Sequence, residues 1–569
     1  MAARTLVLAL GAALLAPGLG RAAEAPAARA AAPQATAYNL AAAGYSAFGS
    51  GDYAGAADLA RAAVQVAPDN RDYRLLLMQA LANAGRAEEA EAAAAEIERR
   101  FGPAPEVAVQ RGHLAVARRD PAAAAEQFAR ALATPGLDPA AARLARLGLF
   151  DARMTLNRPQ EAAAALEGLP ADSYEVRARR AMAAEAAAHP AEAAQAQAAA
   201  AELAPTAESR AYMIRGQVMS LVALERRAEA RQVFDAALRA GALDASDPMD
   251  VAMVAVAVGD DATALAWFAR AEAAGGLKGR AALDAAYAAK RLGRDEAAAR
   301  YFRLGLARAR AGEFALAPQA EMEIRRDVAA ISRRWGFNGY VGYGGAGAAA
   351  PPTGGRGVAQ AGGEAYWRAG GYRSGRTVEV FARAFETVAS DRGDPTGGET
   401  LQGWLGVRHK PFESQNLVFE ASRMIRLGRL SRDDWMLRAA YSAGEGLDLR
   451  LDEASWPMWS AYVDMAHLLD AGQTLGAGEL RLGRSLRLSG GADGGLVLSP
   501  FLGAAAGYDD SLERPLALGW GPGLAGRYWM GGTPDQAPRS YVEMALQFRW
   551  RITGDDRADG LFATFNLAY

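Results

Sequence analysis

Two glycine patterns could do chemistry, because a G-x-G-x-x-G turn can hold the phosphates of a dinucleotide. Such a site requires the glycines to follow a strand and to open a helix. One pattern runs into AAAPPTGG and the other into a segment rich in Trp and Tyr. We therefore expect no cofactor at Gly342, Gly344 and Gly347 or at Gly521, Gly523 and Gly526.

Other groups that commonly carry catalysis lack the spacing that catalysis needs. The chain has no cysteine, which excludes disulfides, thiolate metal sites and a cysteine nucleophile. No Ser-centred elbow or H-E-x-x-H motif occurs. The acids Asp555 and Asp556 fit a turn, GDDRADG. The four histidines are scattered without metal-ligand spacing, so we expect no enzyme, catalytic residue or metal: His113, His189, His409 and His467.

A third pattern is an alternation along the chain in which one face of a segment is apolar and the other face carries the charged residues. Between Tyr541 and Ile552, one face carries Glu543, Arg549 and Arg551, and the other carries only apolar side chains. This alternation over about 9 to 11 residues is typical of a strand that crosses an outer membrane, with its apolar face toward lipid and its polar face toward the barrel interior.

The same alternation recurs in five further segments, Thr377 to Val388, Leu401 to Arg408, Asp434 to Ser442, Trp459 to Ala466 and Glu479 to Leu488. Arg484 is out of phase in the last of these. Both signs of charge occur on the polar faces, so ion pairs inside the barrel are expected. The predicted interior residues are Glu379, Arg383, Arg408, Glu420, Arg438, Asp464, Glu479, Arg481, Glu543, Arg549 and Arg551.

About 12 antiparallel strands are predicted between residues 338 and 569. An even number returns the C-terminus to the side on which the barrel begins. The last strand alternates to the final residue, as in barrel proteins whose terminal strand is recognised by the barrel assembly machinery. The residues of this predicted assembly signal are Leu561, Ala563, Phe565, Leu567 and Tyr569.

The preceding residues, 37–317, repeat themselves and predict an α-solenoid. Equivalent alanines are separated by 34, 34, 38, 31, 37, 34 and 34 residues by subtraction, and four of these spacings equal the tetratricopeptide period. An aromatic residue follows four positions later in several repeats, at Phe128, Phe234, Phe268 and Phe302. The region from 157 to 200 is the least regular. The alanines are Ala56, Ala90, Ala124, Ala162, Ala193, Ala230, Ala264 and Ala298.

The N-terminus predicts export. Arg4 precedes an apolar run and then the small residues Gly20 and Ala22, which is typical of a signal peptide cleaved after residue 22. Ala23 and Ala25 offer a second cleavage site, directly before Pro26. No later run is long and apolar enough for a membrane helix. The predicted order is signal peptide 1–22, Ala/Pro-rich linker 23–36, solenoid 37–317, connector 318–337 and outer-membrane barrel 338–569.

The barrel region resembles the C-terminal domain of the NfrA-type bacteriophage adsorption proteins, which carry tetratricopeptide repeats before a barrel. The matching blocks include GVRHKPFESQNLVFEASRMIRLG from Gly406, DWMLRAAYS from Asp434, GELRLGRSL from Gly478, GPGLAGRYW from Gly521 and APRSYVEMALQFRWRITGDDRADGLFATF from Ala537. The resemblance implies an outer-membrane component of a surface-glycan secretion system, paired with an inner-membrane glycosyltransferase, whose outer loops a phage tail protein can use. This chain is shorter than the family pattern, with fewer repeats.

Two functions are consistent with these features. In the first, the barrel exports an exopolysaccharide while the periplasmic solenoid binds partners or polymer. In the second, a non-conducting barrel anchors the solenoid as a scaffold for envelope complexes and its loops serve as a phage receptor. Small barrels fill with side chains, whereas wide channels occur at 16 to 18 strands. The formal net charge of -2 argues against nucleic acid as a partner.

Overall fold

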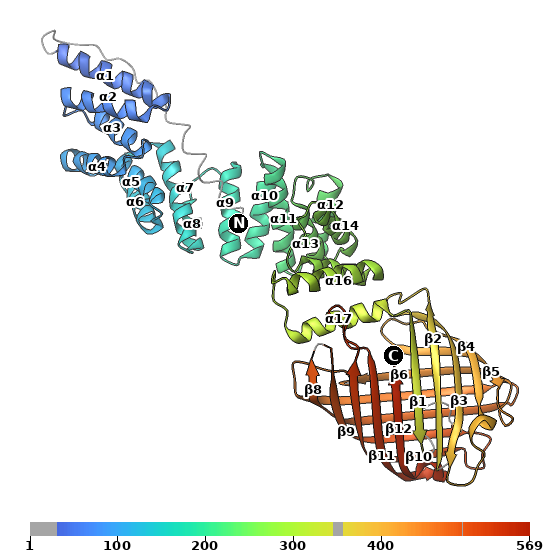
Figure 1. Cartoon of the computed structure of the whole chain (residues 1–569). Helices are drawn as coiled ribbons and strands as arrows, with labels where there is room; N and C mark the ends of the chain where they lie inside the picture. Colours follow the sequence, from blue (N-terminus) through green and yellow to red (C-terminus); the bar gives the residue numbers. More distant parts are fainter. Residues whose placement is uncertain (1–30, 345–356, 492) are drawn as a thin grey trace. The chain divides into compact units, whose positions relative to one another are not determined.

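The computed structural model describes residues 31–344, 357–491 and 493–569. The predicted signal peptide lies outside these residues. Two compact units divide the chain, residues 1–246 and 247–569. The first contains helices α1 to α12, and the second contains α13 to α17 followed by twelve strands. The predicted fold class, a tetratricopeptide-like solenoid followed by an antiparallel barrel of about 12 strands, is confirmed (Figure 1).

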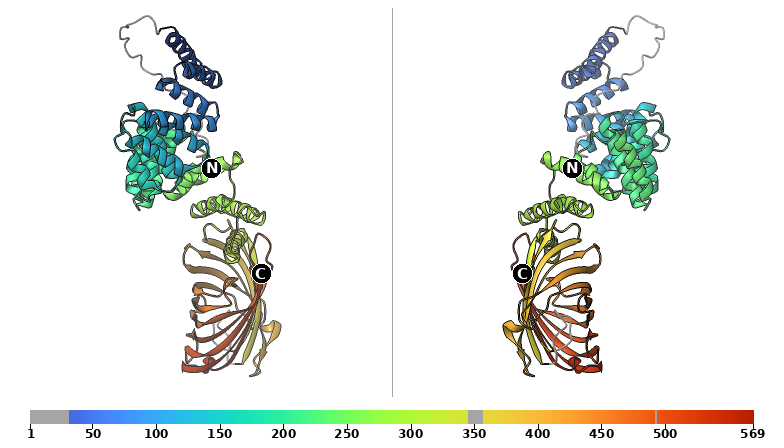
Figure 2. Two further views of the ribbon diagram at one scale, coloured as in Figure 1. Left: turned by 90° about the vertical axis from the view of Figure 1, so that its left-hand side faces the viewer. Right: turned by 90° about the vertical axis from the view of Figure 1, so that its right-hand side faces the viewer.

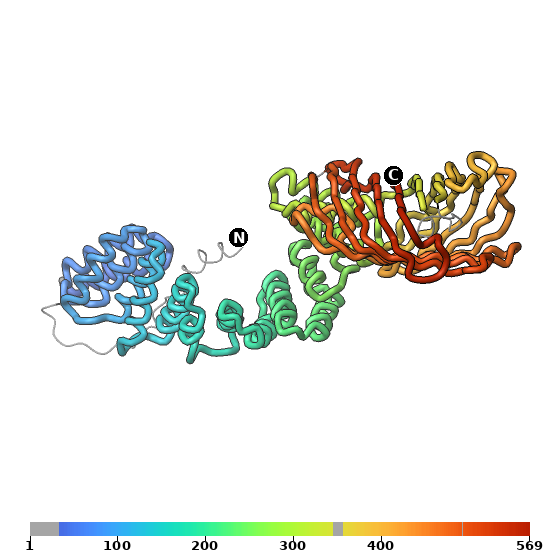
Figure 3. The backbone as a smooth tube through the Cα atoms, turned by 90° about the horizontal axis from the view of Figure 1, so that it is seen from below, coloured from blue at the N-terminus to red at the C-terminus, as the bar shows by residue number. Residues whose placement is uncertain are grey.

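The helices of the first unit form consecutive antiparallel pairs (Figure 3). The eighth is the shortest and falls in the region that is least regular in sequence. The helices are α1 (Ala31–Gly49), α2 (Tyr53–Val66), α3 (Arg71–Asn83), α4 (Ala87–Phe101), α5 (Pro105–Ala117), α6 (Pro121–Ala133), α7 (Pro139–Thr155), α8 (Pro159–Ala165), α9 (Tyr174–Ala186), α10 (Pro190–Glu202), α11 (Ala207–Ala223) and α12 (Arg227–Arg239).

Small residues let these helices approach one another. The ring of Phe128 on α6 is fully buried between Gly112 of α5 and Gly148 of α7. A Cβ atom at either glycine would lie 2.6 Å from that ring, closer than any real contact. All eight phased alanines are also fully buried. The positions that recur in the sequence repeats are therefore the positions at which neighbouring helices contact each other.

The helices of the second unit continue the same pattern up to the barrel. They are α13 (Pro248–Ala257), α14 (Asp261–Ala273), α15 (Ala281–Arg291), α16 (Asp295–Arg310) and α17 (Pro318–Ser332). Two ranges differ from the sequence-based division. Helix α1 begins inside the range assigned to the linker, because Pro33 is tolerated in a first helical turn and alanine favours helix. Helix α17 fills most of the predicted connector, 318–337, and begins with a proline.

Twelve antiparallel strands close into a barrel in which β1 pairs with β12 (Figure 2). Closure is completed at the chain end, where Phe337 and Tyr569 exchange two backbone hydrogen bonds of 3.0 and 2.8 Å. The strands are β1 (Trp335–Tyr343), β2 (Val358–Ala369), β3 (Thr377–Ser390), β4 (Gln402–Lys410), β5 (Asn416–Arg426), β6 (Asp434–Glu445), β7 (Ser455–Leu468), β8 (Gln473–Gly491), β9 (Gly494–Asp509), β10 (Leu516–Met530), β11 (Ser540–Gly554) and β12 (Gly560–Ala568).

The outer wall of the barrel is apolar. Side chains that point outward from the strands are exposed although they are large and hydrophobic, for example Met544 at 63% and Leu546 at 53%. An exposed apolar belt of this kind is unfavourable in contact with water, whereas it is compatible with the lipid of a membrane. Aromatic residues on the same wall are also exposed, and they include Trp335, Trp367, Trp435, Trp459, Trp520, Tyr528 and Trp550.

Candidate functional site

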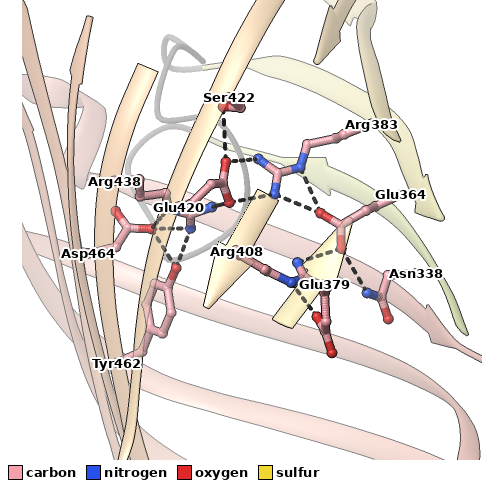
Figure 4. A network of polar contacts seen from close by, with 10 residues as sticks. All are labelled: Asn338, Glu364, Glu379, Arg383, Arg408, Glu420, Ser422, Arg438, Tyr462 and Asp464. Atoms are coloured by element: carbon pink, nitrogen blue, oxygen red, sulfur yellow. Dashed lines mark hydrogen bonds and ion pairs between the residues drawn. The ribbon is translucent and has the colours of Figure 1, made fainter. Parts of the chain in front are cut away.

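The barrel interior gathers most of the charged residues that the sequence singled out. Arg383 of β3 lies between two carboxylates, 2.7 Å from Glu364 of β2 and 3.1 Å from Glu420 of β5. The side chains of all three residues are at most 8% exposed. Figure 4 shows these ion pairs as part of one network on the inner wall.

The network extends along the wall in both directions. Arg408 of β4 contacts Glu364 at 2.7 Å and Glu379 at 2.5 Å, and Arg368 of β2 reaches Glu379 at 2.8 Å. Toward β7, Arg438 pairs with Asp464 and donates a 2.6 Å hydrogen bond to the hydroxyl of Tyr462. Buried charges are stable only when they are paired and hydrogen-bonded, and each carboxylate here has an arginine partner.

A second network occupies the opposite wall. Glu479 of β8 contacts Arg481 at 2.9 Å and Arg549 of β11 at 3.5 Å. Glu543 of β11 pairs with Arg527 of β10, and its carboxylate lies 4.0 Å from Arg481. Strands β8 and β11 are not neighbours, since β9 and β10 lie between them. Long side chains from two separated strands therefore meet inside the barrel.

Glycines on the intervening strands make room for this meeting. Gln547 donates hydrogen bonds of 2.9 and 3.0 Å to the carbonyls of Gly503 and Gly521. A Cβ atom at Gly521 would lie 1.9 Å from the carbonyl oxygen of Phe548, and one at Gly523 would lie 2.4 Å from the Phe501 ring. The second G-x-G-x-x-G pattern thus belongs to strand β10, where its glycines relieve crowding.

Among the eleven predicted interior residues, Arg551 is the one placed apart from the two networks. It shares the inward alternation of β11, but it lies near the strand end and its side chain is exposed. Its backbone N–H donates to Asp559 at 3.4 Å, and no ion pair of its side chain occurs in the described residues. Arg484 lies on the outward face of β8 and donates to Ser455 at 3.1 Å. Sequence reasoning missed the interior residues Glu364, Arg368, Arg527 and Tyr462, although all of them follow the alternation of their strands.

The predicted assembly residues lie on the outer face of β12. Leu561, Phe565 and Tyr569 are exposed, and the two residues between them, Ala563 and Leu567, are half-buried. Leu567 is paired with both neighbours of the strand, Gly339 on β1 and Val542 on β11. The chain end is thus part of the seam that closes the barrel.

Helix α17 lies at the mouth of the barrel where β1 begins. Met322 packs in an apolar cluster with Trp456, Val497 and Trp529, which point inward from β7, β9 and β10, and with Leu449 of the β6–β7 loop. The Gln319 side chain accepts a 2.9 Å hydrogen bond from the N–H of Leu451 in the same loop. Apolar side chains of helix and barrel therefore fill one half of the mouth.

Arg325 fixes α17 to the β10–β11 loop. The residue is 1% exposed, and its Nε donates to the carbonyl of Thr533 at 3.0 Å. Its Nη2 donates to the carbonyl of Gln536 at 3.1 Å, and the N–H of Ala537 donates back to the Arg325 carbonyl at 3.1 Å. Burial lowers the pKa of Arg325. The guanidinium remains charged at any physiological pH, because its ordinary pKa is above 12.

Helix α17 runs from the β6–β7 loop to the start of β1 and contacts the β10–β11 loop on the way. It leads into β1 at its C-terminal end and binds the β6–β7 loop near its N-terminal end, and β1 and β7 are six strands apart in either direction around the barrel. Strands about 4.8 Å apart and tilted by about 40° give a 12-stranded barrel a diameter of about 24 Å. A helix of 15 residues is about 22 Å long, so α17 matches this diameter.

Among the described residues no helix is long and apolar enough to span a membrane. In the same part of the chain, no group of three or more His, Asp or Glu side chains is arranged to hold a metal ion.

The fold and the interior define a class of protein, an outer-membrane-type barrel that carries tetratricopeptide repeats. Residues 393–565 match the family described as "Bacteriophage N adsorption protein A C-term", and residues 47–109 match "Tetratricopeptide repeat". The predicted resemblance is therefore confirmed, and this barrel domain indicates an outer-membrane protein. Domains of these two kinds are typically non-catalytic.

Solved structures of low identity are similar to the repeats. A tetratricopeptide repeat protein from Parabacteroides merdae ATCC 43184 is 14% identical over 42% of this chain and 93% of that chain, with a TM-score of 0.29. The type IV pilus biogenesis factor PilW is 16% identical over 38% and 97%, with a TM-score of 0.30. MamA is 19% identical over 29% and 91%, with a TM-score of 0.26. No curated protein sequence matched the chain.

Proposed function

We propose that the barrel is a closed anchor in the outer membrane for a repeat scaffold that serves a surface-glycan secretion system. The observation that carries this proposal is the state of the barrel interior. Charged side chains are buried in ion pairs along each of the two walls, and α17 with its apolar cluster fills part of the mouth. Of the two functions consistent with the sequence, the anchor fits this interior better than the export pore.

A water-filled pore for a hydrated polymer would leave the inward-facing side chains exposed, whereas those of Glu364, Glu379 and Arg383 are at most 8% exposed. Removing a partner from a buried ion pair costs about 3 to 5 kcal/mol. The network on β2 to β7 contains several such pairs, so opening the interior along that wall is unfavourable without a large compensating interaction. The physical expectation is a barrel that holds its place in the membrane and does not conduct.

Planar-bilayer recording tests the anchor function. The intact protein should insert without giving stable conductance steps, whereas a porin inserted under the same conditions should conduct. A variant that lacks α17 provides a second measurement, because it separates closure by the helix from closure by the ion pairs. Stable conductance by the unmodified protein would reject the closed anchor in favour of the export pore.

The role in glycan secretion rests on the family match, and it implies an inner-membrane glycosyltransferase system and a polysaccharide as partners. Deleting the gene should abolish or strongly reduce surface exopolysaccharide in a strain that secretes one. Complementing the deletion strain with a gene that lacks the repeats α3 to α8 should produce a folded barrel but should not restore secretion. Unchanged surface glycan in the deletion strain would refute this role.

The repeats are proposed to lie in the periplasm. The chain enters the barrel at β1 and ends at β12 on the same mouth as α17, so the repeats and the C-terminus are on one side of the membrane. Protease added to intact cells should leave the repeats uncut, and permeabilising the outer membrane should expose them. Cleavage of repeats in intact cells would contradict this placement.

A second role, phage receptor, is favoured by the loops at the opposite mouth. The carboxylate of the buried Asp434 accepts hydrogen bonds from the N–H groups of Asp470 at 2.8 Å and Ala471 at 3.1 Å, which joins two neighbouring loops. Loops that are already ordered lose little entropy when a phage tail protein binds. Replacing residues 469–472 with a Gly/Ser linker of equal length should reduce adsorption of a phage that depends on this protein. Unchanged adsorption of such a phage would exclude this loop pair.

A further inference from the structure

A cavity lies inside the barrel beside the half of the mouth that α17 and its apolar cluster fill. Its volume is about 410 Å³, which is within the usual range for pockets that bind small molecules. It is lined by residues of β1 to β7, together with the turn between β2 and β3. Polar groups around its rim include Arg368, Tyr372, Thr377, Lys410, Asn416 and Ser442.

The ion pairs of the first network border this cavity, and their charges balance. Four arginines, Arg368, Arg383, Arg408 and Arg438, are paired with four carboxylates, those of Glu364, Glu379, Glu420 and Asp464. These groups leave no net charge on the wall. Any charge offered to a ligand must therefore come from another residue.

Lys410 supplies that charge. It is at the end of β4, on the inward side of the strand, and it lines the cavity. Its ammonium group donates a 2.9 Å hydrogen bond to the carbonyl of Gly375, and no ion pair to it occurs among the described residues. A lysine ammonium has three donors, and a single carbonyl satisfies one of them. The carboxylate of Glu413 acts on this ammonium group electrostatically but forms no ion pair with it among the described residues, so Lys410 brings a positive charge with unused donors to the cavity.

We propose that this cavity binds the carboxylate or phosphate group of a small polar ligand, with Lys410 as the anion-binding residue. The Asn416 amide and the Thr377 hydroxyl line the same cavity and offer hydrogen bonds to the uncharged part of such a ligand. A charge-assisted hydrogen bond in a partly enclosed site is stronger than a neutral one. This binding does not depend on whether the barrel conducts.

Lysine chemistry provides a direct test, because the chain has only three lysines, Lys278, Lys290 and Lys410. The intact protein in detergent is acetylated at graded times with and without a ligand, and each lysine is followed by mass spectrometry. The ligands are glucuronate, inorganic phosphate and, as the neutral control, glucose. Glucuronate or phosphate should slow acetylation of Lys410 while glucose does not, and exposed Lys278 should react at the same rate throughout.

Calorimetric titration with the same compounds measures the contribution of the charge. Lys410→Met should weaken binding of the effective anion by about tenfold or more, and Lys410→Arg should retain most of the affinity. Lys278→Met is the matched control and should bind as the unmodified protein does. Heat-modifiable mobility on a gel verifies that each variant retains a folded barrel.

The set of compounds that protect Lys410 from acetylation shows which kind of anion the cavity binds. Protection by glucuronate alone would assign the site to an acidic sugar, and protection by phosphate as well would assign it to small oxyanions in general. Equal protection by glucose, or no protection by either anion at millimolar concentration, would overturn the proposal. So would unchanged affinity in Lys410→Met.

Discussion

Ion pairs between arginine and carboxylates occur in both the repeats and the barrel interior, but their environments differ. In the repeats, Arg300 and Glu272 join α16 to α14 at 2.6 Å with side chains that are 54% and 34% exposed. In the barrel, Arg383 and Glu364 are separated by a similar distance, 2.7 Å, with side chains that are 7% and 8% exposed. Water screens the charges of the first pair. The charges of the second pair are shielded from water, so each depends on its partner for stabilisation.

The same residue types therefore stabilise the two regions in different ways. The repeats are stabilised by buried alanines and aromatic rings, and an exposed ion pair adds little to that. In the barrel interior the carboxylates and guanidiniums form part of the core, beside a buried apolar cluster that includes Phe381, Phe385 and Trp404. Loss of one partner there leaves a buried charge without compensation, so the barrel should be far more sensitive to single charge changes than the repeats.

The largest expected effect comes from shortening the last strand. Removing Phe565 to Tyr569 deletes the pairing partners of β1 from Asn338 to Val341 and leaves edge groups without hydrogen bonds in lipid. The barrel should fail to assemble, and no heat-modifiable band or protease-protected fragment should appear in outer-membrane fractions. Removing the repeats before about residue 200 is the control and should leave the barrel insertable. A folded barrel at normal abundance after the five-residue truncation would show that the terminal strand is dispensable.

The next effect concerns the centre of the interior network. Arg383→Met leaves Glu364 and Glu420 without their shared partner, and the free energy of unfolding should fall by about 3 to 5 kcal/mol. Urea unfolding of the barrel in detergent, followed by gel mobility, measures this loss. Adding Glu364→Gln to Arg383→Met should recover part of it, because it restores the balance between positive and negative charges in the network, where Glu364 otherwise keeps Arg408 as its partner. A loss below about 1 kcal/mol in the single variant would mean that water enters the interior freely.

A smaller effect is expected where α17 meets the barrel. Arg325→Met removes charge-assisted hydrogen bonds to the carbonyls of Thr533 and Gln536, and hydrogen bonds to a charged group contribute about 1.5 to 3 kcal/mol. Limited proteolysis within residues 531–539 should become faster. Arg310→Ala is the matched control, because its pair with Asp535 joins the same loop but is about 40% exposed on both sides, and its loss should be below about 1 kcal/mol. Equal sensitivity of the two variants would contradict the docking described for Arg325.

The smallest effect is a pH dependence in the repeats. Hydrogen bonds from Arg300 lower the pKa of Glu272 below its ordinary value of 4.5. Because the folded pKa is the lower one, this carboxylate contributes stability above pH 4.5 and loses it as the pH falls through the folded pKa. Glu272→Gln should therefore destabilise the protein at pH 7 by less than about 1 kcal/mol and should have no effect at strongly acidic pH. Thermal melts followed by circular dichroism at several pH values measure the difference, and an equal loss at every pH would point to packing instead.

The sequence predicted the features that depend on local periodicity. Alternation in the segment around Glu543 and Arg549 indicated a strand with a polar inner face, and the spacing of Ala56, Ala90 and Ala124 indicated the repeats. Both regularities reflect which face of an element contacts its neighbours. Glu364 was missed because its strand, β2, is rich in glycine and alanine and shows the alternation only over Glu364, Tyr366 and Arg368.

Features that depend on closure of the barrel could not be read from the sequence. The contacts of Arg325 with Thr533 and Gln536 join residues more than 200 positions apart, and they exist only once twelve strands have fixed the positions of their loops. For the same reason α17 was assigned to a connector. The meeting of Glu479 and Arg549 likewise requires small residues on two intervening strands.

The length of α17 has a mechanical consequence for the barrel. A helix that is fixed to the β6–β7 loop near one end and joined to β1 at the other resists compression along its axis, since it cannot shorten without breaking its backbone hydrogen bonds. The mouth can therefore become narrower at right angles to the helix, but not along the helix axis. Lateral pressure from the bilayer should flatten the barrel in one fixed direction, and each flattening movement should draw the β10–β11 loop along with Arg325.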